Sequence, residues 1–508
     1  MTEITQAHKE PLAHNDRALC ASHYGAARNQ IIYKTYVSDT ETAIGAMMKL
    51  SRDMPYACLL ESVEGGEVRG RYSIIAIAPD LIWRSKGDVV EINRNPDADI
   101  HHFERVDEAP LTSLRSLIAE GAMPNTGPLP SMAAGLFGYF GYDMIRHQEA
   151  IPDNNPPALD SYDSTWMRPS IVAIFDRLKD TVTVATQIRP QPGISADEAF
   201  DNAHQRLESA KQRLGEALPG TPDGHATHQE VEPTRNMTPD GYKAMVRKAK
   251  AYIAKGDIFQ VVLSQRFSID FKLPAISLYR SLRRLNPSPF LFYFAMDDVS
   301  VVGSSPEILV RLRDGEVTIR PIAGTRKRGA TPEEDEANAA DLLADVKERA
   351  EHLMLLDLGR NDVGRVAQPG SVRVHSNYII EYYSHVMHIA SEVSGKIRAG
   401  FDGIDAMLAG FPAGTVSGAP KIRAMEIIDE LEPDKRGIYA GAIGYIGATG
   451  DIDTCIALRT AVIKDGKMHI QAGAGIVYDS VDQSEHEECE NKARALIRAA
   501  NDALRFGH

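Results

Sequence analysis

Short runs of β-branched and apolar residues, most of them ending near Gly, Pro or Asp, recur through most of this chain. The first half holds such runs at residues 31–37, 55–62, 71–79 and 168–177. Their length and composition predict strands, and the short turns between them favour antiparallel pairing. The predicted helices lie between groups of strands, which argues against repeated βαβ units. We therefore predict an α+β fold in which large antiparallel β-sheets form a sandwich-like core, with helices packed outside.

Changes in composition predict where the regions of the chain begin and end. A polar helical stretch and a segment rich in Pro, Gly and His separate two regions that carry the strand-like runs. After this segment, Thr238 and Pro239 match the N-cap and first-turn residues that open a helix. The predicted parts are a polar N-terminal extension (1–28), an N-terminal region (29–190), a helix and linker (191–237) and a C-terminal region (238–505).

Charge and residue usage exclude several classes of function. The formal net charge is −14, and such a field repels polyanions, so we expect neither nucleic-acid nor membrane binding. No apolar run approaches the roughly 20 residues that span a bilayer, and no signal-peptide pattern opens the sequence, so we expect a cytoplasmic location. The four cysteines are widely spaced, which predicts reduced, unpaired thiols.

Two predicted helices each carry a pair of glutamates three residues apart. These pairs are Glu348 with Glu351, and Glu485 with Glu488. Residues at this spacing share one helix face, so the two helices together could offer oxygen ligands to one hard cation such as Mg²⁺. The spacing alone equally fits a solvated helix surface. Zinc is a weaker alternative because no second His or Cys cluster accompanies these glutamates.

Three glycine-rich turns allow the backbone to approach a ligand closely. They occupy residues 321–329, 410–421 and 471–480. Free backbone N–H groups in such turns can bind carboxylate or phosphate oxygens. None of the turns has the spacing of a P-loop or a dinucleotide fingerprint, and ordinary turn geometry would explain each one separately.

Taken together, eleven segments resemble component I of anthranilate synthase, within the family of chorismate-utilising enzymes. That family also includes aminodeoxychorismate, isochorismate and salicylate synthases. The resemblance covers most of residues 30–500 and is densest after residue 238. The matching segments, in order, are LLESVE (59–64), GDIFQVVLSQRF (256–267), NPSPF (286–290), SSPEILV (304–310), RPIAGTRKRG (320–329), ERAEHLMLLDLGRNDVGRV (348–366), HVMHIASEVSG (385–395), FPAGTVSGAPKIRAMEII (411–428), GIYAGAIGY (437–445), DTCIALRTAV (453–462) and QAGAGIVYDSVDQSEHEECENKA (471–493).

The resemblance implies a site for Mg²⁺ and chorismate. Glu351 and Glu488 would be the direct metal ligands, with Glu348 and Glu485 as nearby helpers. A cation between crowded carboxylates removes their mutual repulsion, and it would hold the ring carboxylate of chorismate. The implied contacts to the rest of chorismate come from Arg459 and Tyr439 on the enolpyruvyl carboxylate, and from the backbone of Gly324, Thr325, Gly473, Ala474 and Gly475.

Two positions bear on which nucleophile attacks chorismate. Gln260 stands where the water-using relatives have a lysine base, and Ala323 stands where aminodeoxychorismate synthases of the best-known type have a lysine nucleophile. Both residues favour direct attack by ammonia, giving 2-amino-2-deoxyisochorismate. By the same resemblance, Glu307 would protonate the leaving hydroxyl and Thr415 would position the substrate. His388 would assist the elimination of pyruvate that yields anthranilate, the first committed step of tryptophan biosynthesis.

The resemblance also implies a partner subunit and an inhibitor. No cysteine lies in the nucleophile setting that glutamine hydrolysis requires. Ammonia would therefore come from a separate glutamine amidotransferase subunit, in a heterotetramer with two copies of each chain. Feedback-inhibiting tryptophan would bind beside Glu61, at Ser62, Pro289, Phe290 and Leu291. The alternatives left open are aminodeoxychorismate synthase component I, another chorismate-converting enzyme, and a noncatalytic tryptophan-sensing binding protein.

Overall fold

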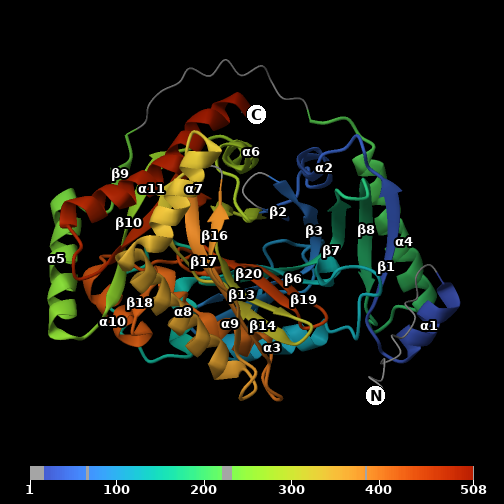
Figure 1. Ribbon diagram of the computed structural model, residues 1–508. Coiled ribbons are helices and arrows are strands. Elements are labelled where there is room, and N and C mark those ends of the chain that lie inside the picture. The colour runs from blue at the N-terminus through green and yellow to red at the C-terminus, as the bar shows by residue number, and fades with distance from the viewer. Residues whose placement is uncertain (1–15, 65–67, 220–231, 384–385, 507–508) are drawn as a thin grey trace, which may run out of the picture.

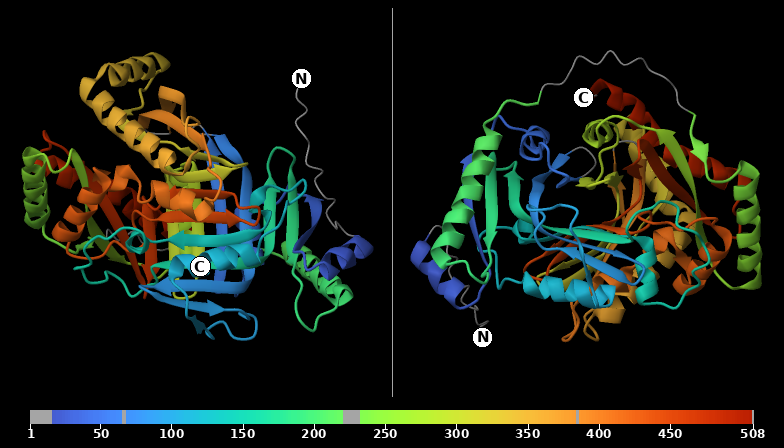
Figure 2. Two further views of the ribbon diagram at one scale, coloured as in Figure 1. Left: turned by 90° about the horizontal axis from the view of Figure 1, so that it is seen from below. Right: turned by 180° about the vertical axis from the view of Figure 1, so that it is seen from behind.

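The computed structural model describes residues 16–64, 68–219, 232–383 and 386–506. Every strand pairing recorded among these residues is antiparallel, and the strands form two layers (Figures 1 and 2). The predicted α+β sandwich is therefore confirmed. The first layer runs from edge to edge through β1 (Gln30–Val37), β8 (Thr181–Ile188), β7 (Ser164–Asp176), β3 (Val68–Lys86), β2 (Tyr56–Glu64), β11 (Phe290–Met296), β12 (Val299–Ser305), β21 (Thr460–Lys464), β22 (Lys467–Ile476) and β10 (Gln260–Asp270), with β9 (Thr234–Arg235) and β18 (Gly418–Ala419) beyond β10.

The second layer shares β3 and β7 with the first. β3 and β7 are long strands whose two halves pair with different neighbours, and so pass from one layer to the other. The order of the second layer is β5 (Glu104–Val106), β4 (Val89–Asn93), β3, β7, β6 (Gly135–Phe140), β19 (Ala442–Gly447), β20 (Ile452–Ile456), β13 (Ile308–Arg313), β14 (Glu316–Ile319) and β17 (Val386–Lys396), with β15 (Ile322–Lys327) on the same side of β17 as β14 and β16 (Arg373–Tyr382) on the other.

Two prolines mark the place where β3 and β7 change layers. Pro79 of β3 lies directly opposite Pro169 of β7, and the register shifts between Pro79 and Leu81. Proline has no N–H to donate, so the hydrogen-bonded ladder is interrupted there. Strands commonly bend at such irregularities, which lets one strand contribute to both layers of a sandwich.

A core of buried side chains fills the space between the two layers. The first layer contributes Cys58, Ile74 and Phe292, and the second contributes Phe137 and Ile443. Burying apolar surface stabilises a fold by roughly 25 cal/mol per Å², so this interior is a large favourable term. Because β2 pairs with β11 and β6 pairs with β19, strands of the predicted N-terminal and C-terminal regions share this core.

Helices cover the outer faces of the sandwich. The first layer is covered by α1 (Arg17–Gly25), α2 (Ala43–Leu50), α4 (Ala196–Leu214), α6 (Ala275–Leu285) and α11 (Asp482–Ala503). The second layer and the end of β10 are covered by α3 (Pro110–Glu120), α5 (Pro239–Lys255), α7 (Pro332–Ala344), α8 (Val346–Val366), α9 (Gly403–Gly410) and α10 (Lys421–Leu431). The short 3-10 turns are η1 (Ser131–Ala133), η2 (Tyr142–His147), η3 (Gly414–Val416) and η4 (Leu504–Phe506). In the described ranges no helix has the length and apolar character needed to cross a membrane.

The N-termini of α5 and α8 are both capped by polar side chains. The predicted opening of α5 is confirmed, because the Thr238 side chain accepts a hydrogen bond from the N–H of Gly241 at 3.1 Å. The stretch 337–356 has apolar residues at helical spacing but is not one continuous helix, because α7 ends at Ala344 and α8 begins at Val346. Asp345 leaves the helical conformation and caps a new helix by accepting hydrogen bonds from the N–H groups of Lys347 and Glu348. Glu348 and Glu351 therefore lie in the first two turns of α8 rather than in the middle of a longer helix.

Candidate active site

The four predicted metal-binding glutamates come together from α8 and α11. Burial raises the pKa of Glu351, and the negative charges of Glu348 and Glu488 add to the rise, while a 3.4 Å hydrogen bond from Gln260 Nε2 opposes it. Burial likewise raises the pKa of Glu485, and Glu488 contributes to this rise as well. The carboxylates of the two helices are therefore close enough to repel one another. We call these four residues the glutamate cluster.

The four carboxylates of the glutamate cluster do not converge on one point as metal ligands would. Among the residues that the structure describes, no three of His, Cys, Asp and Glu are placed to hold a metal ion. Instead Glu348 lies 3.3 Å from Nη1 of Arg326, and Glu488 lies 2.7 Å from Nζ of Lys492. Carboxylates that repel one another turn toward available basic groups. The set nevertheless fits a hard cation, because it offers several carboxylate oxygens and its most buried member, Glu351, has no basic partner among the described residues.

Backbone turns bring the predicted substrate cradle against this cluster. Gly324 has φ +70°, a conformation that favours glycine, and a Cβ there would lie 3.1 Å from Glu348 Oε2. A Cβ on Gly475 would lie only 2.5 Å from the Gln260 amide. Lys492 Nζ donates to the Gly473 carbonyl at 2.8 Å, which ties α11 to β22. The positive φ at Gly324 favours glycine, and the close contacts at Gly324 and Gly475 bring this backbone against α8 and β10.

Glu307 and Arg459 are a buried carboxyl and a buried guanidinium beside the cradle. Burial raises the pKa of the Glu307 carboxyl to about 8, although the Thr415 hydroxyl, the Ile322 backbone and the charge of Arg459 oppose the rise. Thr415 Oγ1 makes no well-aligned hydrogen bond within the described ranges, so it acts on Glu307 only as a nearby polar group. Burial also lowers the pKa of Arg459, whose guanidinium has no salt bridge among the described residues. Glu307 is thus an acid near neutral pH, and Arg459 is a cation available to an anionic ligand.

His388 lies on β17, next to the same groups. Its Nδ1 donates to the Gly324 carbonyl at 2.8 Å and lies 3.1 Å from Thr325 Oγ1. Burial lowers the pKa of His388 to about 4, and the charge of Arg459 lowers it further, against the effect of the Gly324 hydrogen bond. The imidazole is therefore neutral near pH 7. Since Nδ1 carries the donated proton, Nε2 is left as the basic nitrogen.

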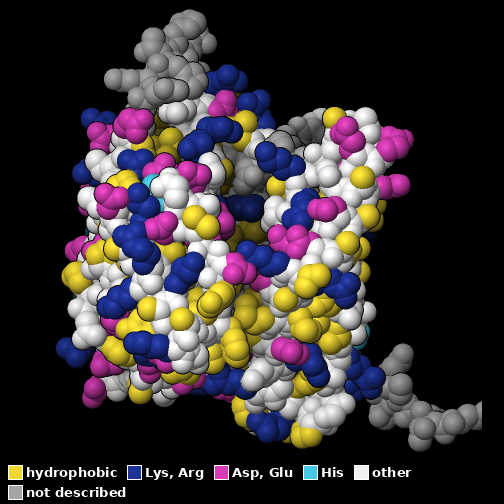
Figure 3. All heavy atoms as spheres, turned by 60° about the vertical axis from the view of Figure 1, so that its left-hand side comes forward, with side chains coloured by type: hydrophobic (Ala, Val, Ile, Leu, Met, Phe, Trp, Pro, Cys, Tyr) yellow, Lys and Arg dark blue, Asp and Glu magenta, His cyan; other side chains and the backbone are white. Residues whose placement is uncertain are grey.

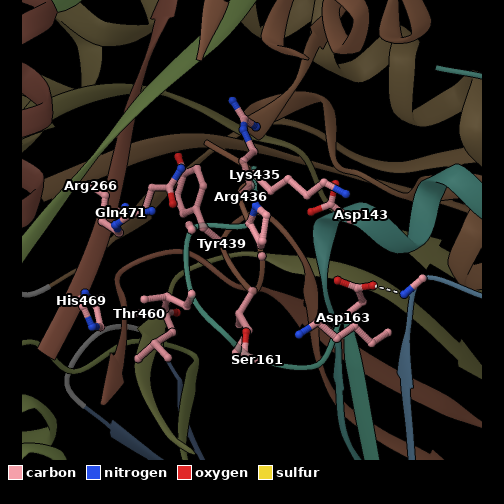
Figure 4. Close-up of a pocket in the computed structure, with 18 residues that line it drawn as sticks. Asp143, Ser161, Asp163, Arg266, Lys435, Arg436, Tyr439, Thr460, His469 and Gln471 are labelled. Carbon is pink, nitrogen blue, oxygen red and sulfur yellow. Dashed lines mark hydrogen bonds between the residues drawn. The ribbon is translucent and has the colours of Figure 1, made fainter. Parts of the chain in front are cut away.

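Tyr439 lines a small cavity on the far side of the cradle. A Cβ on Gly473 would lie 2.8 Å from the Tyr439 hydroxyl, so the phenol reaches the glycine turn. Figure 4 shows Tyr439 beside Arg436, between Arg266 on one side of the cavity and Asp163 on the other; the cavity volume is about 170 Å³. Both neighbouring arginines have acidic partners, Arg436 with Glu432 and Arg266 with Asp434.

The two discriminating residues and Ala474 are also near this site. Gln260 and Ala323 are buried, and Ala323 pairs with Ile389 next to His388. The side-chain oxygen of Gln260 has no hydrogen-bond partner among the described residues. Ala474 is buried on β22 opposite Leu263. Every predicted catalytic and chorismate-contacting residue therefore lies within one contiguous set of elements.

A second, larger cavity lies between β2, β11 and the β16–β17 hairpin. Its volume is about 860 Å³, and its lining includes all four residues of the predicted tryptophan site, Ser62, Pro289, Phe290 and Leu291. We call it the inter-region cavity. The face drawn in Figure 3 is hollowed between two blocks of side chains, and Lys or Arg side chains are visible inside the hollow.

A buried ion pair network stands at the wall of the inter-region cavity. Glu61 accepts hydrogen bonds from Arg283 at 2.5 and 3.0 Å, from the Tyr279 hydroxyl at 2.8 Å and from Ser73 Oγ at 2.9 Å, and it pairs with Arg177. Burial alone would raise the pKa of Glu61, but the guanidinium of Arg283 and its other donors lower it below the usual value. The sequence placed Glu61 beside this site but gave no sign of its partners, of which Arg283, Tyr279 and Arg177 are more than 100 residues away.

The fold and most of the sequence match known chorismate enzymes. The family described as chorismate binding enzyme matches residues 78–498. The chain belongs to this family. Anthranilate synthase component 1 of Cereibacter sphaeroides is 56% identical over 481 residues, covering 95% of this chain and 96% of that protein. The corresponding protein of Aquifex aeolicus is 46% identical, covering 92% and 94%.

Solved structures of chorismate binding enzymes show the same fold. The crystal structure of anthranilate synthase component I from Streptococcus pneumoniae aligns with a TM-score of 0.74 at 38% identity, covering 84% of this chain and 92% of that one. The menaquinone-specific isochorismate synthase of Escherichia coli aligns with a TM-score of 0.71 at 19% identity, covering 96% and 99%, a likeness of fold alone. The predicted resemblance to chorismate-utilising enzymes is therefore confirmed.

Proposed function

We propose that the chain is component I of an anthranilate synthase, which aminates chorismate with ammonia and then eliminates pyruvate. The observation that carries this proposal is the meeting of Glu307, Arg459 and His388 beside the glutamate cluster. One group is an acid, one is a cation and one is a base at neutral pH. Curated relatives that are named for this activity, and that cover almost the whole chain, support the same reaction.

The first step uses the buried acid. Ammonia attacks C2 of chorismate, the two ring double bonds shift, and the C4 hydroxyl leaves as water after accepting the Glu307 proton. Because Glu307 is protonated up to about pH 8, it can donate at neutral pH. Arg459 and Tyr439 hold the enolpyruvyl carboxylate during this step. The attacking nitrogen loses one proton to solvent, and Glu307 takes one back from solvent, so the net change is replacement of the hydroxyl by an amino group with release of water. The product is 2-amino-2-deoxyisochorismate.

The second step uses the buried base. Nε2 of His388 takes the C2 proton while the bond between C3 and the enolpyruvyl oxygen breaks. The proton ends on the methyl group of pyruvate, and the ring becomes aromatic as anthranilate. The hydrogen bond from Nδ1 to the Gly324 carbonyl holds the imidazole in the required tautomer.

Glu351 and Glu488 would hold Mg²⁺, with Glu348 and Glu485 beside them. The ion, when bound, would neutralise the cluster and bind the ring carboxylate of chorismate. To bind the metal, Glu348 would have to break its ion pair with Arg326, and Glu488 its ion pair with Lys492. Such exchange requires only side-chain rotation at half-exposed positions.

Ammonia, rather than water or a lysine amine, is the proposed nucleophile. Gln260 is a neutral amide that donates a hydrogen bond to Glu351, so it cannot deprotonate water. The side chain of Ala323 has no nucleophilic atom. The four cysteines are buried, and burial raises the pKa of Cys58, Cys455 and Cys489, so none is a reactive thiolate. Glutamine-derived ammonia would therefore come from a separate amidotransferase subunit, with two copies of each chain in the assembly.

Exposed apolar side chains that adjoin the elements of the glutamate cluster would receive that subunit. Phe259, Val346, Tyr478 and Val481 are each more than half exposed. Phe259 precedes Gln260, Val346 begins α8, and the Val481 carbonyl accepts the N–H of Glu485. Large exposed apolar side chains grouped at one place are typical of protein interfaces. A subunit seated there would deliver ammonia without loss to solvent.

Tryptophan would bind in the inter-region cavity and act as a feedback inhibitor. The cavity is large enough for an amino acid and is lined by both apolar and charged side chains. Ser62, Pro289, Phe290 and Leu291 would contact it. Because the cavity is distinct from the glutamate cluster, the inhibition would be allosteric. A cytoplasmic location stays a prediction.

One assay tests the reaction. Purified chain is given chorismate and ammonium salt, with and without Mg²⁺, and anthranilate fluorescence and pyruvate are followed. We expect both products in equal amounts, and only with Mg²⁺. Aminated product without pyruvate would indicate an aminodeoxychorismate synthase, and tryptophan binding without any turnover would indicate a noncatalytic sensor; either result would overturn the proposal.

A further inference from the structure

Tyr383 lies between the inter-region cavity and His388. Its side chain is buried and lines the cavity. On the other side its ring packs edge to face against the imidazole of His388, with ring centroids 5.3 Å apart. The Tyr383 N–H donates to the Val386 carbonyl at 2.8 Å, which closes the β16–β17 hairpin. One side chain thus contacts both a candidate ligand cavity and the candidate base.

The hydroxyl of Tyr383 connects to charged groups in the cavity wall. It donates to Glu381 Oε2 at 3.0 Å, and the other oxygen of Glu381 pairs with Arg320. Both Glu381 and Arg320 line the inter-region cavity. Glu381 also lies directly opposite His388 in the strand register, so the two side chains share one face of the hairpin. Arg320, Glu381, Tyr383 and His388 therefore form a continuous chain of contacts.

We propose that Tyr383 is a positioning residue that orients His388 and transmits the occupancy of the inter-region cavity to it. This inference rests on the proposed function, because it assigns the effect to the elimination step. A ligand carboxylate that binds Arg320 would compete with Glu381 for the guanidinium. Release of Glu381 would free the Tyr383 hydroxyl, and the ring would no longer hold the imidazole in one orientation.

The physical basis is the limited number of contacts that hold the imidazole. Nδ1 is fixed by the Gly324 carbonyl and Thr325, but these contacts define only one edge of the ring. The packing of the Tyr383 ring against the imidazole restricts rotation about the side-chain bonds of His388. Catalytic groups that are misplaced by about 1 Å can lose around a hundredfold in rate, so a modest reorientation would be sufficient. Effector coupling in proteins commonly changes binding or activity by about 5- to 150-fold.

The first experiment separates the two chemical steps. In Tyr383→Leu, we expect chorismate consumption to stay within about threefold of the parent, while the ratio of pyruvate formed to chorismate consumed falls about fivefold or more, because the amino intermediate accumulates. Tyr383→Phe keeps the ring but lacks the hydroxyl that Glu381 holds, so its ratio should lie between those of Tyr383→Leu and the parent. Tyr36→Leu, on edge strand β1, is the matched control for loss of a tyrosine. Equal ratios in Tyr383→Leu and the parent, with both folded by circular dichroism, would overturn the proposal.

The second experiment tests the connection to the cavity. Tyr383→Phe cuts the hydrogen bond to Glu381, so the tryptophan concentration that halves its activity should rise about fivefold or more above the parent value. Calorimetry with tryptophan should show that binding itself changes less than twofold, because the phenol supplies only part of the cavity wall. Unchanged inhibition in Tyr383→Phe would overturn the proposal. If the parent makes no anthranilate at all, the proposed function has failed instead, which keeps the two failures distinguishable.

Discussion

Two regions of the molecule bury glutamate carboxylates in opposite ways. At the wall of the inter-region cavity, Glu61 is surrounded by donors, and the guanidinium of Arg283 holds its pKa below the usual value despite burial. At the candidate active site, burial raises the pKa values of Glu307 and Glu351, and no salt bridge among the described residues offsets it. The same type of side chain thus stabilises the structure in one region and lacks a salt-bridge partner in the other.

The difference shows where the fold accepts an energetic cost. Burying a charge is costly unless it is paired, and one unit of pKa shift corresponds to about 1.4 kcal/mol. The network at Glu61 joins β2, β3, the turn after β7 and α6, and it needs no ligand. Glu307 and Glu351 have no salt-bridge partner among the described residues, so a proton or the proposed substrate or cation would offset their burial. Strained or unsatisfied groups of this kind are typical of functional sites.

The largest effect is expected from Glu307→Gln. This variant removes the proposed acid while keeping shape, so kcat for anthranilate formation should fall about 10³-fold. Stability should change little, because the neutral amide replaces a carboxyl that is already protonated near neutral pH. Steady-state kinetics and thermal unfolding check both statements, with the exposed Glu336→Gln as a matched control. A kcat within tenfold of the parent would remove Glu307 from the mechanism.

A loss of stability is expected instead when Glu61, the carboxylate paired with arginines, is replaced. Glu61→Gln would leave the guanidinium groups of Arg283 and Arg177 buried without a counter-charge, so the free energy of unfolding should fall by about 3 kcal/mol. Denaturant unfolding measures this change. Glu351→Gln is the contrasting variant, and it should not lower the free energy of unfolding, because it relieves like-charge repulsion. Equal destabilisation by both substitutions would erase the distinction between the two regions.

The pH dependence of the amination rate should report the protonation of Glu307. Glu307 donates only when protonated, and its pKa is about 8. The amination rate at constant free ammonia should therefore be level below about pH 7 and fall roughly tenfold for each pH unit well above 8. The pH–rate profile in Glu307→Gln should lose this feature. A parent profile that is level to pH 10 would show that Glu307 is not the acid.

A smaller effect is expected at the inter-region cavity. Ser62→Leu projects a larger side chain into the cavity without touching Glu307 or the glutamate cluster. The tryptophan concentration that gives half inhibition should rise about tenfold, and kcat should stay within about twofold. Inhibition curves with ammonia as substrate measure both quantities. Retention of the parent's sensitivity would place tryptophan elsewhere.

The sequence predicts single helices and strands better than the tertiary contacts between them. The spacing of Glu348 and Glu351, and of Glu485 and Glu488, is visible in the sequence, but their approach depends on how α8 and α11 pack on different layers. Glu61 and Arg283 are 222 residues apart, and no local pattern connects them. The break before α8 was visible in part, since Asp345 precedes Glu348 by three residues, the spacing of a helix cap. Tyr383 had no signal, because its role depends on the hairpin that places it against His388.

The account depends most on the convergence of two helices on one divalent cation. Mn²⁺ can stand in for Mg²⁺, and its binding in the presence of chorismate is measured by electron paramagnetic resonance, in the parent and in the double variant Glu351→Gln, Glu488→Gln. We predict one Mn²⁺ per chain in the parent and at least a hundredfold weaker binding in the double variant, as expected when metal ligands are removed. Equal Mn²⁺ binding by the two proteins would contradict the account.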